Sequence, residues 1–180
     1  MLDNLGQLHN AIVAGLRAKI EGAPTIDAYP VIERRIVLPA VLIELAQMEP
    51  GADPGTGETA LIGSFQARAI VDPNARNADL AVRELAARIA VAITHETWGL
   101  DVGVAQLVQI GEDAFKPELD SYLVWLVEWT HQFHLGRTAW PYPDDTGKTL
   151  VIGMYPATGF GHEDDYMVPG EELPAHWGEQ

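Results

Sequence analysis

Apolar residues recur in the first twenty positions at steps of three and four, the spacing of one helical face. The members of this stripe are Leu5, Leu8, Ile12, Leu16 and Ile20. The spacing predicts an amphipathic helix from Asn4 to Glu21, with Asp3 as its N-cap. Gly22 and Pro24 follow it, and both residue types commonly end helices.

A second helical pattern starts after a break in the chain at residues 72–77. Asn77 is the predicted N-cap, and the helix runs to about Glu96, with Gly99 in its C-cap region. The stripe that we expect to be buried consists of Val82, Leu85, Ala86, Ile89 and Ile93.

Strand patterns occupy the region between these helices. Residues 39–45 are short, branched and apolar, which is typical of a core strand, and residues 31–38 are expected to be extended. A loop rich in Gly and Pro follows at 49–57, and residues 59–71 alternate between apolar and polar. We therefore expect the strands at 39–45 and 59–71 to pair across the loop.

Two more strands are predicted after the second helix, at 102–110 and 120–135, and a short one at 150–155. One face of the long strand would carry Leu123, Trp125, Val127, Trp129, His131 and Phe133. Its first half is apolar on both faces, which predicts a central or covered position in the sheet.

The order of these elements predicts an α+β fold, with a mostly antiparallel sheet and two helices on one face. With 180 residues the chain has room for one such domain, at 1–136, followed by an extension at 137–180. The extension is irregular, rich in Pro and Gly, and acidic. From residue 138 onward it has eight acidic residues and one lysine.

The charge of the chain disfavours whole classes of partner. There are 26 acidic and 11 basic residues, for a formal net charge of −15. Nucleic acids and anionic membranes attract basic proteins, so neither is an expected binding partner. The chain has no cysteine, which excludes disulfides and thiol catalysis, and no signal peptide or membrane span is predicted.

No catalytic, cofactor or metal site is predicted, although one metal-based alternative stays open. The loop at 55–59 resembles a phosphate-binding loop only superficially, because Glu58 stands where lysine is required. The alternative is a metal-dependent hydrolase that uses Glu128, His131, His134 and His162. On a strand, His131 and His134 point to opposite faces, which argues against a shared ion.

Tryptophans are the candidates for subunit contacts. Trp125 and Trp129 share one strand face, where they serve either a core beneath the helices or an interface. Trp98, Trp140 and Trp177 lie in loop-like segments and are the stronger interface candidates. A small adaptor domain that binds one protein through these segments is a further alternative.

Several segments resemble the tail terminator, or tail completion, proteins of tailed bacteriophages. The similarity covers residues 1–136, in which the predicted N-terminal helix is followed by segments that are similar in sequence to that family. These segments are Leu38–Leu45, Thr59–Arg68, Asp79–Leu85 and Tyr122–Gln132. The segment Gly159–Tyr166 is similar to one in terminators of contractile tails.

The resemblance implies a homohexameric ring in the virion that caps the tail tube, ends its growth and presents a surface for head–neck joining. Its partners would be the tail tube protein and a neck or head–tail connector protein, with the tail sheath as a further candidate. DNA would pass through the ring without specific binding, since like charge lowers its affinity for the wall. The candidate lumen acids are Glu112, Asp113, Glu118 and Asp120.

Overall fold

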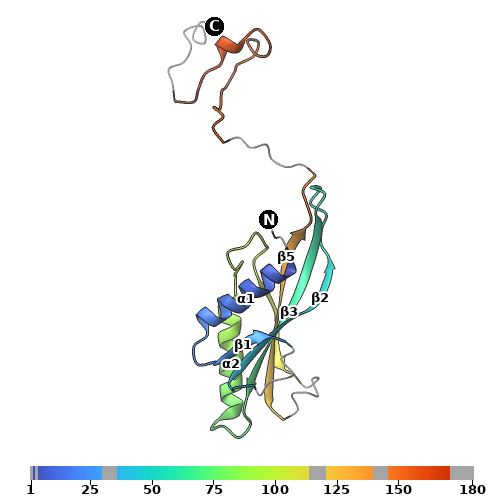
Figure 1. The fold of residues 1–180 in the computed structure, drawn as a ribbon, viewed down its shortest axis with the longest axis vertical. Coiled ribbons are helices and arrows are strands. Elements are labelled where there is room, and N and C mark those ends of the chain that lie inside the picture. The colour runs from blue at the N-terminus through green and yellow to red at the C-terminus, as the bar shows by residue number, and fades with distance from the viewer. Residues whose placement is uncertain (1, 3, 30–35, 114–120, 140–145, 171–180) are drawn as a thin grey trace. The chain divides into compact units, whose positions relative to one another are not determined.

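The computed structural model describes residues 2, 4–29, 36–113, 121–139 and 146–170, and the chain divides into two compact units. The first unit, Met1–Trp140, contains two helices on the same side of a five-stranded sheet (Figure 1). The predicted α+β class is therefore confirmed. The second unit is Pro141–Gln180.

Helix α1 (Leu5–Lys19) begins one residue later than predicted and has a different cap. Its N-cap is Asn4, whose Oδ1 accepts a hydrogen bond of 3.0 Å from the backbone N–H of Gln7. This bond satisfies one of the amides that the first turn leaves without a partner. Asp3, the predicted cap, lies outside the described residues.

Helix α2 (Ala78–Ile93) ends three residues before the predicted position. Asn77 precedes it as predicted, but in the left-handed region at φ +55° and without a side-chain hydrogen bond to the helix. Thr94 is the C-cap, and its Oγ1 donates to the carbonyl of Ala90 at 2.7 Å. Gly99 therefore lies in the following loop rather than in the cap, at φ +71°.

The sheet has the order β1-β2-β3-β5-β4. Its strands are β1 (Thr25–Ala28), β2 (Ala40–Pro50), β3 (Thr59–Val71), β4 (Gln106–Glu112) and β5 (Leu123–Leu135). Strand β1 runs parallel to β2, and the other neighbours are antiparallel. The pairing of β2 with β3 is as predicted. Strand β1 has no counterpart in the prediction, and β4 begins four residues later than expected.

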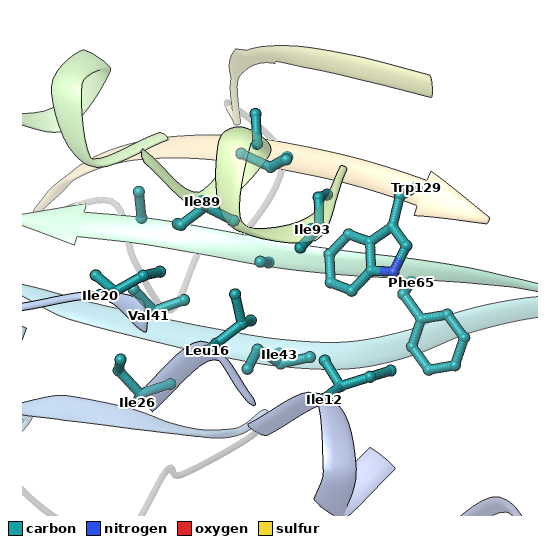
Figure 2. Packing of buried hydrophobic residues seen from close by; sticks show 14 of the residues in the cluster. Ile12, Leu16, Ile20, Ile26, Val41, Ile43, Phe65, Ile89, Ile93 and Trp129 are labelled. Carbon is teal, nitrogen blue, oxygen red and sulfur yellow. The ribbon is translucent and has the colours of Figure 1, made fainter. Parts of the chain in front are cut away.

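The main core lies between the helices and one face of the sheet. Ile12 and Leu16 from α1 and Ile89 and Ile93 from α2 point into it (Figure 2). All five residues of the predicted α2 stripe are buried. In the sheet layer the rings of Phe65 and Trp129 stack with centroids 5.7 Å apart.

The opposite face of the sheet carries a smaller apolar cluster. Ala40, Leu42, Ile70 and Val124 are buried there, with Tyr29, Ile36, Leu38 and Tyr122 packed against them. This cluster explains why the first half of β5 is apolar on both faces. Strand β5 lies between β3 and β4, so its predicted central position is confirmed.

The second unit has little regular structure among its described residues. The strand predicted at 150–155 is wrong: Ile152 forms only an isolated bridge with Met167, and a 3₁₀ turn spans Glu163–Asp165.

The first unit extends further than predicted. Its residue Ala139 donates to the carbonyl of Thr56 at 2.6 Å, so the boundary expected after residue 136 is too early. No helix among the described residues is long and apolar enough to cross a membrane.

Candidate assembly surface

Strand β4 forms one edge of the sheet, because it pairs with β5 and with no other described strand. Leu107, Val108 and Ile110 on this strand are exposed hydrophobic residues. The strand contains no Lys, Arg or Pro, the residues that commonly protect an exposed edge from pairing. This edge is therefore open to a further strand.

Hydrogen-bond alternation shows which groups of β4 point away from β5. The N–H of Asp113 donates to the carbonyl of Val124 at 3.1 Å, so Asp113 is oriented toward β5. Antiparallel strands alternate between residues that bond to the neighbour and residues that do not. Gly111 and Gln109 therefore face β5, whereas the backbone groups of Ile110 and Glu112 face outward.

A second open edge lies at the other end of the strand order, on β2. Strand β1 pairs with β2 only over Ala40–Ile43, and no described strand lies beside Gln47–Pro50. The N–H of Gly51 donates to the carbonyl of Ala60 at 2.9 Å, so the same alternation orients Met48 and Pro50 outward. Pro50 suits this position, since it has no N–H to donate.

Each open edge contains a β-bulge at nearly the same level of the sheet. The register shifts between Leu45 and Gln47 in β2 and between Leu107 and Gln109 in β4. The residues opposite these shifts include the stacked pair Phe65 and Trp129. Bulges bend a strand and increase its twist, so the two edges bend beside this pair.

The sheet face opposite the helices has a buried arginine at its centre. Arg68 is 2% exposed, and its guanidinium donates to Asp113 and Glu44, each at 2.7 Å, and to Gln66 at 2.8 Å. It also lies over the ring of Tyr29, 5.0 Å from the centroid. These contacts balance the buried charge, and sequence reasoning missed them because Arg68 occupies a position that alternation marks as polar and exposed.

This network corrects the assignment of Asp113 as a lumen acid. Its side chain is only 6% exposed and is paired with Arg68, so it serves the fold. Glu112 is exposed at the end of β4 and stays a candidate. Glu118 and Asp120 lie outside the described residues.

Both ring nitrogens of His131 are engaged in structural hydrogen bonds. Nδ1 lies 2.8 Å from the carbonyl of Gly103, and Nε2 accepts from Nε1 of Trp98 at 2.9 Å. A neutral ring with the proton on Nδ1 satisfies both contacts. Burial lowers the pKa of His131, and the bond to Gly103 only partly opposes this shift. The ring therefore has no lone pair left for a metal ion.

Glu128 and His134 lie on the sheet face opposite His131, so neither can share a metal ion with it. Glu128 accepts from Gln109 and Gln66 on the opposite sheet face. His162, in the second unit, contacts Asp165 at 2.8 Å. Among the described residues no group of three potential ligands is placed to hold a metal ion.

The predicted interface tryptophans have different environments. Trp129 is fully buried, which corrects its assignment as an interface residue: it belongs to the core. Trp125 is half-buried, with Arg83 5.5 Å from its ring centroid, and Trp98 is half-buried in the loop after α2. Trp140 and Trp177 lie outside the described residues.

No family model matches this chain, and no curated protein sequence matches it.

Proposed function

We propose that this chain is the subunit of a structural ring, the tail terminator of a tailed bacteriophage. Six copies form the ring, which caps the tail tube, ends its polymerisation and provides a joining surface for the head–neck complex. The observation that carries the proposal is the pair of open strand edges on opposite sides of one sheet. Two different edges join head to tail, and head-to-tail contacts close into a ring when the rotation is right.

Two further features support the same function. Helix α1, strands β2 and β3, helix α2 and the long strand β5 follow one another in the order of the segments that carry the resemblance to tail terminators. The net charge of −15 favours a ring through which DNA slides, because an acidic wall repels the phosphate backbone. The proposed partners are the tail tube protein and a neck or head–tail connector protein, with assembly into the virion.

The proposal is tested by measuring assembly of the full chain with and without tail tubes. Light scattering after size-exclusion chromatography gives the mass, and negative-stain electron microscopy shows rings or capped tubes. We expect six-subunit rings in solution or at tube ends, and tubes that stop growing when the protein is added. A chain that stays monomeric and leaves tube ends and tube growth unchanged would refute the proposal.

A further inference from the structure

We propose that the ring contact is a strand-to-strand junction, in which β4 of one copy pairs with the Gln47–Pro50 part of β2 in the next copy. The five-stranded sheet of each subunit would then continue into its neighbour. This inference rests on the proposed ring and adds to it the surface that closes the ring.

The backbone groups on the two edges are complementary. Ile110 and Glu112 on β4 and Met48 on β2 direct their N–H and C=O groups outward. Pairing of two exposed strand edges satisfies such groups through main-chain hydrogen bonds, as in other cases of strand addition. The four residues Gln47–Pro50 match in length the part of β4 that follows its bulge, Gln109–Glu112.

The side chains at these positions match as well. Ile110 is opposite Val127 in the register, and Met48 is opposite Gly63. Val127 and Gly63 lie on the face of the sheet that carries the helices, so Ile110 and Met48 lie on that face too. They are 41% and 46% exposed, and both become covered when they lie side by side in the junction.

A second copy is a better occupant of each edge than an unrelated protein. The chain supplies both halves of the junction, on opposite sides of its sheet, and repeating this contact uses both edges of every subunit. Self-pairing of β4 with β4 would leave the β2 edge open and would produce a dimer. The two arrangements therefore predict different products.

The absence of cysteine makes cross-linking a direct test of the junction. We would make Met48→Cys, Ile110→Cys and the double variant, and oxidise each under conditions in which the wild type assembles. Paired strands place Cα atoms about 4.5–5.5 Å apart, within disulfide range. We expect the double variant to give a ladder of covalent oligomers up to six chains, and each single variant to stay uncross-linked.

A proline variant tests the junction without cross-linking. Ile110→Pro removes an outward N–H and leaves the bonds between β4 and β5 in place, so the folded monomer should persist. We expect at least a tenfold loss of assembly at a given concentration, with circular dichroism unchanged. Val91→Ser, on an exposed position of α2, is the matched control and should assemble like wild type.

The outcomes separate this inference from the proposed function. If rings form without a ladder in the double variant, or persist in Ile110→Pro, the proposed strand junction is wrong and the proposed ring function still stands. Dimers from Ile110→Cys alone would show β4 self-pairing and would also overturn the junction. A wild-type chain that neither forms rings nor caps tubes would overturn both.

Discussion

Substitution of Gly15 by alanine should destabilise this protein, although alanine is the better helix former. Gly15 lies within α1, where replacement of glycine by alanine normally stabilises a helix by about 1 kcal/mol. The ring of Trp98 occupies the space beside it. A Cβ added at Gly15 would lie 2.6 Å from Cζ3 of Trp98 and still closer to Cε3.

The indole has little freedom to move away. Its Nε1 donates to His131 at 2.9 Å, and Lys19 lies over the ring at 5.6 Å from the centroid. Overpacking of this kind costs about 1–3 kcal/mol. If the ring moves instead, loss of the bond to His131 costs about 0.5–1.5 kcal/mol. The gain in helix propensity offsets part of this cost, so we expect Gly15→Ala to lower the free energy of unfolding by about 1 kcal/mol.

Urea denaturation followed by circular dichroism measures this change in the free energy of unfolding. Ala14→Gly, at the exposed neighbouring position of the same helix, measures the propensity effect alone and should cost about 1 kcal/mol. In a Trp98→Ala background the clash is gone, so Gly15→Ala should become stabilising. A stabilising effect of Gly15→Ala in the wild-type background would refute the proposed contact.

Three further predictions concern groups outside this contact. Arg68→Met should lower the free energy of unfolding in urea by about 3 kcal/mol, because it breaks two buried ion pairs; a loss under about 1 kcal/mol would contradict their structural role. His131 has a lowered pKa in the folded state, so its protonation favours unfolding: stability should be full above pH 6.5 and fall on acidification, by at most about 1.4 kcal/mol per pH unit, with a shallower slope in His131→Gln. A chain ending after Ala139 should melt at a higher temperature than one ending after Gly136, since only the longer one keeps the hydrogen bonds to Thr56; equal melting temperatures would show that these bonds add no stability.

Sequence patterns predicted the elements whose burial is periodic. Strand β3 has the predicted bounds because its middle, residues 63–67, alternates between buried and half-buried positions, and one of its faces packs against the helices. The α2 stripe was predicted completely for the same reason, since its spacing leaves one apolar face. In both cases the local pattern already contains the physical constraint that the fold imposes.

Elements that depend on distant partners were not predictable in this way. Strand β1 has only four residues, and it is a strand because β2 lies beside it. The charge of Arg68 is buried because two acids far apart in sequence approach it: Glu44 from the neighbouring strand β2, and Asp113 from the end of β4, two strands away. Neither contact leaves a periodic signal, so an acid such as Asp113 looks like any other surface acid until the sheet is assembled.

The proposed assembly surface belongs to this second kind of feature. An edge is defined by a missing neighbour, and the sequence of β4 alone, with Leu107, Val108 and Ile110, suits a buried strand as well as an exposed one. Only the sheet order shows that these residues have no partner strand among the described residues, and only the register shows that Met48 and Ile110 share a face. The exposed apolar side chains of the two edges are placed where a second copy can cover them. An isolated subunit should consequently be prone to associate through its edges, and assembly should depend on β4 more strongly than on any tryptophan.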